Sequence, residues 1–144
     1  MTYLTRRYSF SASHRLHSEQ LGPEENARLF GKCNNPFGHG HNYFLEVTIG
    51  GELDLLSGMV ASTAALDRHV ERAVLFRLDH SDLNADLPEF GSLVPTTENL
   101  GLQIGRWLQE GWEQRCSGRA TGRLKRIRLE ETGSNTIEIE FHGQ

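Results

Sequence analysis

The chain has 144 residues and a formal net charge of -4, with 37% hydrophobic and 24% charged residues. This composition is typical of a globular protein, and the acidic balance gives no general attraction to nucleic acid or to an anionic membrane. No stretch approaches the roughly 18 apolar residues of a membrane span. Residues 1–10 also lack the apolar core of a signal peptide. We therefore expect a cytoplasmic protein with a single domain over residues 1–144.

The first third of the chain predicts two strands separated by a long loop. Apolar and polar residues alternate over 4–14, apart from Arg6, which is typical of a half-buried strand. Residues 15–38 are rich in Gly, Pro, Asn and charge, and predict a loop with a short helical turn near residues 24–29. Alternation returns over residues 40–50 and predicts the second strand.

Two amphipathic helices are predicted next. Apolar residues at helical spacing predict the first helix over residues 61–77. The second begins after Pro95, with Thr96 or Thr97 as its N-terminal cap. Residues 114–122 follow this helix and are predicted to form a polar loop.

The chain ends in two more predicted strands. They lie around residues 127–131 and 137–141, and residues 132–135 suit a tight hairpin turn. The order β-β-α-α-β-β predicts an α+β fold, a four-stranded antiparallel sheet with two helices on one face. Pairing of its open edges between subunits would remove an aggregation hazard.

Histidine is the expected source of metal ligands. The chain has seven His but only two Cys, too few for a cysteine-rich zinc module. His39 and His41 are two residues apart on one strand, so their side chains share a face. His14 ends the first strand on its apolar face, and pairing of the two strands would bring the three imidazoles together. Three His with an open fourth position are typical of catalytic zinc, although the pair alone also suits surface histidines and His14 suits a core.

Cys33 precedes these ligands in the long loop and has three interpretations. It is a fourth zinc ligand that closes a structural site, a base or nucleophile beside the metal, or an inert buried thiol. Cys116 lies in the predicted polar loop and is given no role.

Three further groups are candidates for the site. Asp79 and His80 are adjacent, so a turn is needed for the carboxylate to orient the imidazole; the alternative is a solvated helix end. Glu131 continues the apolar face of its strand, where a carboxylate needs a partner, either a ligand with N–H donors or an Arg. The stretch Thr96, Thr97 and Glu98 also suits a plain helix cap.

Several motifs together resemble the 6-pyruvoyltetrahydropterin synthase family. They are SFSASHRLHS at 9–18, LFGKCNNPFGHGHNY at 29–43, GELDLLSGMV at 51–60, LDHSDLN at 78–84, PTTENL at 95–100 and LEETGSN at 129–135. The resemblance implies the tunnelling fold (T-fold), in which the sheets of three subunits join into a barrel. Two trimers stack into a homohexamer with active sites at subunit interfaces.

The resemblance also assigns roles to the candidate residues. It implies one Zn²⁺ per subunit, held by His14, His39 and His41. The family's catalytic cysteine corresponds to Cys33, and its proton-transfer pair to Asp79 and His80. Its pterin-anchoring glutamate corresponds to Glu131, and residues that line its pterin pocket correspond to Thr96, Thr97 and Glu98.

The activity implied is that of a phosphorus-oxygen lyase of tetrahydrobiopterin biosynthesis. Such an enzyme converts 7,8-dihydroneopterin triphosphate to 6-pyruvoyl-tetrahydropterin and eliminates triphosphate. The main alternative is 6-carboxytetrahydropterin synthase of queuosine biosynthesis, which uses the same substrate and also releases acetaldehyde. In that branch three residues usually separate the cysteine from the His-Gly-His, whereas five separate Cys33 from His39. The remote alternative is a non-catalytic zinc module closed by Cys33.

Overall fold

The computed structural model describes residues 1–116 and 118–142. Residue 117 of the predicted polar loop and residues 143–144 lie outside the described residues. The strands are β1 (Thr2–His14), β2 (His39–Gly51), β3 (Ser81–Asp82), β4 (Arg123–Thr132) and β5 (Asn135–Glu140). The α-helices are α1 (Pro23–Phe30), α2 (Thr63–Val70), α3 (Phe76–Leu78), α4 (Leu83–Asp86), α5 (Thr97–Gln109) and α6 (Trp112–Cys116). Two 3₁₀ turns, η1 (Gly31–Asn34) and η3 (Pro88–Phe90), and a π-helical turn, η2 (Glu71–Leu75), complete the elements.

The sheet has five strands in the order β3-β1-β2-β4-β5, so the predicted four-stranded antiparallel sheet is wrong in detail. The four long strands are antiparallel, as expected, but β3 pairs in parallel with β1 at Ala12 and Ser13. The reason is local: the His80 amide donates to the Ser11 carbonyl at 2.6 Å and so holds the chain against β1. Two residues that follow a helix thereby join the sheet. A strand of two residues is too short to show an alternating pattern in the sequence.

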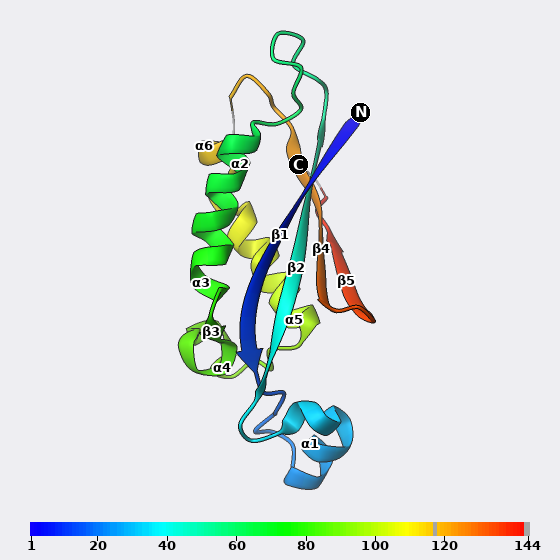
Figure 1. Ribbon diagram of the computed structural model, residues 1–144, viewed down its shortest axis with the longest axis vertical. Coiled ribbons are helices and arrows are strands. Elements are labelled where there is room, and N and C mark those ends of the chain that lie inside the picture. The colour runs from blue at the N-terminus through cyan, green and yellow to red at the C-terminus, as the bar shows by residue number, and fades with distance from the viewer. Residues whose placement is uncertain (117, 143–144) are drawn as a thin grey trace.

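The two long helical runs, α2 to α3 and α5, lie against one face of the sheet, as the sequence predicts, whereas α1 lies beyond the end of β1 and β2 (Figure 1). The first predicted helix runs through α2, η2 and α3 without a break, and the second is α5, capped by the Thr96 side chain. Alternate residues of β2 and β4 are fully buried beneath them. The core consists of these residues and the apolar stripes of α2 and α5, among them Leu45, Ile127, Leu66 and Ile104.

Arg6 is the one charged residue on the apolar face of β1, and it pairs with a carboxylate on the helices that pack against this face. Its guanidinium makes two hydrogen bonds to the Asp67 carboxylate of α2, at 3.1 and 2.7 Å. The Tyr8 hydroxyl donates to the same carboxylate at 2.6 Å. This cluster joins the sheet to α2 and explains the one departure from alternation in the strand.

The predicted polar loop after α5 is wrong in its first part. Residues 112–116 form α6, and both Trp112 and Cys116 are buried. Only two of these residues are apolar, too few for a helical pattern to show in the sequence. Burial raises the pKa of the Cys116 thiol to about 11, as expected for an inert core thiol. Among the described residues, the longest apolar helical stretch falls short of what would cross a membrane.

Candidate active site

The pairing of β1 with β2 brings three histidines together at one end of the sheet. In this antiparallel ladder His14 is opposite His39, and Ala12 is opposite His41. Residues 15–38 connect the two strands through α1 at that end of the molecule (Figure 1). The predicted convergence of the imidazoles is confirmed, since one ring nitrogen of each lies within 4.8 Å of the others.

The hydrogen bonds of these rings leave nitrogens free for a metal. His14 Nδ1 lies 2.9 Å from the Pro95 carbonyl, which can only accept, so this nitrogen carries the proton. His14 Nε2 then presents its lone pair 3.2 Å from His39 Nε2. His41 Nε2 is buried and has no hydrogen-bond partner among the described residues. Backbone carbonyls orient metal-bound histidines in this way, and the donor set fits Zn²⁺ or a similar divalent cation.

Burial also favours the neutral imidazoles that a metal needs. The side chain of His14 is 1% exposed, and its removal from water lowers its pKa. Burial lowers the pKa of His39 as well, and the neighbouring His41 acts in the same direction. Burial therefore favours the neutral form of both rings, in which one nitrogen of each offers a lone pair.

Glu131 lies beside this cluster, where β4 has a bulge between Glu130 and Thr132. Its Oε1 is 3.6 Å from His41 Nε2, and its side chain is 11% exposed. The Thr97 hydroxyl donates to Oε2 at 2.5 Å. The sequence predicted a partner for this carboxylate, and the partner in the structure is a threonine from α5. The bond to Thr97 uses one of the carboxylate's lone pairs, so the others remain available to N–H donors.

Cys33 lies in the 3₁₀ turn η1 and is partly exposed. The group of metal-binding side chains found among the described residues holds the three histidines and not Cys33. Burial raises the pKa of this thiol, and the negative charge of Glu131 raises it further. Both effects favour the protonated thiol when no substrate is bound.

Asp79 and His80 lie on the outer side of β1. His80 Nδ1 is 3.2 Å from Asp79 Oδ2, and Asp79 Oδ1 accepts from the Ser11 amide at 2.9 Å. The turn that the sequence required is present, since His80 has a positive φ of 62°. The imidazole is solvent-exposed and lines a groove of about 520 Å³ with His41 and Asn42.

The three residues before and at the start of α5 separate into different environments. Thr96 caps the helix, with its hydroxyl accepting from the Asn99 amide at 3.1 Å. Thr97 is 2% exposed and contacts Glu131. Glu98 is exposed in the first helical turn. The plain cap interpretation therefore describes Thr96, and Thr97 is the residue of this stretch that reaches the site.

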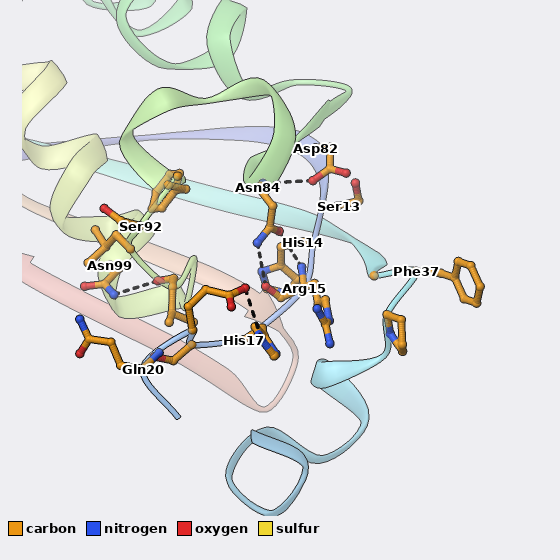
Figure 2. A pocket seen from close by; sticks show the side chains of 18 residues that line it. Ser13, His14, Arg15, His17, Gln20, Phe37, Asp82, Asn84, Ser92 and Asn99 are labelled. Atoms are coloured by element: carbon orange, nitrogen blue, oxygen red, sulfur yellow. Dashed lines mark hydrogen bonds and ion pairs between the residues drawn. The ribbon is translucent and has the colours of Figure 1, made fainter. Parts of the chain in front are cut away.

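A cavity of about 540 Å³ opens beside His14 (Figure 2). Arg15, His17 and Asn84 are among its lining residues, and sequence reasoning missed all three. The Asn84 amide accepts from the Arg15 backbone N–H at 2.8 Å and donates to its carbonyl at 3.0 Å. A polar side chain that binds the backbone of a distant loop produces no periodic pattern in the sequence. The Arg after His14 and the Asn of LDHSDLN were the only sequence cues.

Comparison with known proteins agrees with this geometry. A family model described as 6-pyruvoyl tetrahydropterin synthase matches residues 3–141. The chain is 45% identical over 134 residues to 6-pyruvoyl tetrahydrobiopterin synthase of Homo sapiens, covering 93% of this chain and 88% of that protein. It is 43% identical over 135 residues to the Poecilia reticulata enzyme of that name, covering 94% and 87%.

A solved structure gives the same result for the fold. Caenorhabditis elegans 6-pyruvoyl tetrahydropterin synthase superposes with a TM-score of 0.86 at 38% identity, covering 98% of this chain and 96% of that one. The fold is therefore the T-fold that the motifs implied, with the small parallel strand β3 added to the expected sheet. The chain belongs to the 6-pyruvoyl tetrahydropterin synthase family.

Proposed function

We propose that this protein is a lyase that converts 7,8-dihydroneopterin triphosphate to 6-pyruvoyl-tetrahydropterin with elimination of triphosphate. The observation that carries the proposal is the placement of a buried carboxylate, Glu131, 3.6 Å from a cluster of three imidazoles. It combines an anchor for N–H donors with a metal-binding group, in a chain 41–45% identical to named 6-pyruvoyl tetrahydrobiopterin synthases. The redox change is internal to the substrate, so no nicotinamide is required.

One zinc ion per chain, held by His14, His39 and His41, is part of the proposal. The orphaned His41 Nε2 and the Pro95 contact that frees His14 Nε2 support it. When bound, the ion would polarise the side-chain oxygens of the substrate and acidify the adjacent C–H bonds.

Glu131 would bind the pterin ring. A carboxylate accepts two parallel N–H bonds, which matches the 2-amino and ring N–H edge of a pterin. Thr97 fixes the carboxylate from behind by its bond to Oε2. The substrate's side chain would then extend from this anchor toward the three histidines, since His41 adjoins Glu131.

Cys33 is proposed to accept a proton from the substrate side chain, and His80, oriented by Asp79, to relay one. Burial and the charge of Glu131 favour the protonated thiol. Substrate binding has to promote release of that proton, and pterin N–H groups paired with Glu131 would weaken the second of these two effects. The Asp79 carboxylate lies 3.2 Å from His80 Nδ1 and so can orient the ring for the transfer.

A second subunit would bring its Asp79–His80 pair close to the Glu131 of the first. Among the described residues, the outer edge of β1 over 2–10 and the outer edge of β5 have no strand partner. These edges run in opposite directions, so β5 of one chain can continue the antiparallel sheet beside β1 of the next. The β4–β5 turn near Glu131 would then lie next to Asp79 and His80. We propose a barrel-forming trimer, and a homohexamer of two trimers.

Product analysis tests the function. Purified protein incubated with dihydroneopterin triphosphate should yield 6-pyruvoyl-tetrahydropterin and triphosphate without acetaldehyde. Release of acetaldehyde at full turnover would instead identify a 6-carboxytetrahydropterin synthase. Absence of any turnover by zinc-loaded protein would leave the structural zinc module as the better interpretation.

Two cysteine variants test the site. Cys33→Ala should abolish turnover and keep one zinc per chain, because the metal group does not include Cys33. Cys116→Ala is the matched control and should retain both, since Cys116 is a buried core residue of α6 and not part of the metal group. Stoichiometric loss of zinc from Cys33→Ala would show that this residue is a metal ligand.

A further inference from the structure

The turn that carries Cys33 is attached to the rest of the protein by hydrogen bonds and not by burial. None of the four residues of η1 (Gly31–Asn34) is buried, and residues 35–37, which follow it, are exposed. A turn without apolar packing keeps a fixed position through its polar contacts. The contacts that place the Cys33 thiol can therefore be identified one by one.

These contacts run to residues 15–17, the segment that leaves β1. The Leu16 amide donates to the Cys33 carbonyl at 2.8 Å. Arg15 Nε donates to the Asn34 carbonyl at 3.1 Å, and Asn34 Nδ2 donates to the Leu16 carbonyl at 2.7 Å. Three hydrogen bonds in both directions thus join the turn to this segment.

Asn34 supplies the side-chain part of the attachment. A backbone carbonyl can only accept, so the bond to Leu16 fixes which way the Asn34 amide is turned. The same amide nitrogen lies 3.0 Å from His17 Nδ1, and this ring nitrogen must accept because the amide nitrogen can only donate. Both hydrogens of one amide group therefore bind the segment after β1, at two different residues.

The segment that receives these bonds is itself fixed from another direction. The Asn84 side chain in α4 accepts from the Arg15 amide at 2.8 Å and donates to the Arg15 carbonyl at 3.0 Å (Figure 2). His14, the residue before, is held by the Pro95 carbonyl at 2.9 Å. A metal-binding residue and the segment after it thus form a rigid support, to which Asn34 ties the turn that carries the thiol.

We propose that Asn34 is a positioning residue, which holds the Cys33 thiol in place to take a proton from the substrate. The role rests on the proposed function, in which Cys33 accepts that proton. The Asn34 side chain binds Leu16 and His17, and it is not part of the metal-binding group. Its loss should therefore act through the position of the base, where an error of about 1 Å can cost about 100-fold in rate.

Alkylation of Cys33 by iodoacetamide tests the position of the thiol without any turnover. Zinc-loaded protein with Cys116→Ala is used, so that Cys33 is the remaining cysteine of the two. Asn34→Ala should be alkylated at least about threefold faster at neutral pH, because a released turn loses the burial that raises the pKa of the thiol and gains thiolate. Asn34→Leu keeps the approximate shape of the side chain without its donors and should react equally fast.

Steady-state kinetics separates positioning of the base from a loss of folding or of substrate binding. Asn34→Ala should lower kcat about tenfold or more and leave KM within about twofold, because the proposed pterin anchor, Glu131, lies on β4. Bound zinc should stay at one per chain, since the three imidazoles lie on β1 and β2.

The neighbouring amide provides a matched control. The Asn35 side chain accepts from the Phe37 amide at 3.2 Å and so binds within its own loop. Asn35→Ala removes the same group from the next residue and should match the wild type in alkylation rate and in kcat. Circular dichroism of each variant establishes that its fold is intact.

Three results would overturn the proposal. They are an unchanged alkylation rate of Cys33 in both Asn34 variants, a kcat equal to that of the wild type, and a loss of zinc from Asn34→Ala. The last result would make Asn34 a support of the metal site instead of the thiol. If the wild type does not turn over dihydroneopterin triphosphate, the proposed function fails, and the alkylation rates still decide whether Asn34 holds the thiol.

Discussion

Replacement of Thr97 by valine tests whether one hydroxyl holds the Glu131 carboxylate in place. The hydroxyl donates to Oε2 at 2.5 Å, and both side chains are shielded from water, with 2% of Thr97 and 11% of the Glu131 side chain exposed. Valine keeps nearly the shape of threonine and removes the donor. The carboxylate therefore loses a bond while the packing around it stays the same.

The expected loss of stability follows from these contacts. A hydrogen bond to a charged group is worth about 1.5–3 kcal/mol. His41 Nε2 also lies near this carboxylate, at 3.6 Å, which is beyond good hydrogen-bond length. Thr97→Val should therefore lower the free energy of unfolding by about 1.5–3 kcal/mol, or the melting temperature by about 4–9 °C in a chain of this length.

Urea unfolding measures this effect, with every variant at the same chain concentration because association makes apparent stability depend on concentration. Thr97→Ser keeps the hydroxyl and is the control, expected near the wild type apart from the lost methyl group. A double-mutant cycle with Glu131→Gln should give a coupling energy of about 1 kcal/mol or more. The reasoning is refuted if Thr97→Val is as stable as Thr97→Ser, or if the two substitutions are additive.

Three further predictions concern the metal, the sheet-to-helix cluster and the loop beside His14. His39→Ala should lower bound zinc from one per chain to a small fraction, measured by metal analysis after dialysis, because two imidazoles do not complete the site; full retention would contradict this ligand set. Burial acts against ionisation of Asp67, but hydrogen bonds from Tyr8 and Arg6 outweigh it and lower its pKa. The stability that ionised Asp67 confers is then complete above the unfolded carboxyl pKa of about 3.9, and it is lost as pH falls through the lower pKa of the folded state. Asp67→Asn should therefore make stability depend less on pH in the acid range. An unchanged pH dependence would assign the acid sensitivity to other carboxyls. Asn84→Ala removes both bonds to the Arg15 backbone and should cost about 1–3 kcal/mol in urea unfolding, whereas a neutral result would mean that water replaces the amide.

Much of the fold follows from local patterns in the sequence. Alternation of apolar and polar residues predicted the four long strands, because successive side chains of a strand point to opposite faces. Helical spacing and the Thr96 cap predicted the two long helical runs. The same rule placed His39 and His41 on one face and Glu131 on the buried face of its strand. Each of these inferences uses residues only a few positions apart, where backbone geometry fixes how side chains relate.

The remaining features depend on contacts between distant residues. Only the folded chain could place the Pro95 carbonyl at His14, 81 positions away, or a threonine of α5 against Glu131. It also decided that β3 pairs with β1, that Cys116 is buried, and that the Asp79 and His80 side chains are exposed. Local periodicity carries no information on such contacts, because they are set by the packing of whole elements against one another. The sequence by itself thus determined which residues are candidates for the chemistry, and the tertiary structure decided which of them lie together and which partners orient them.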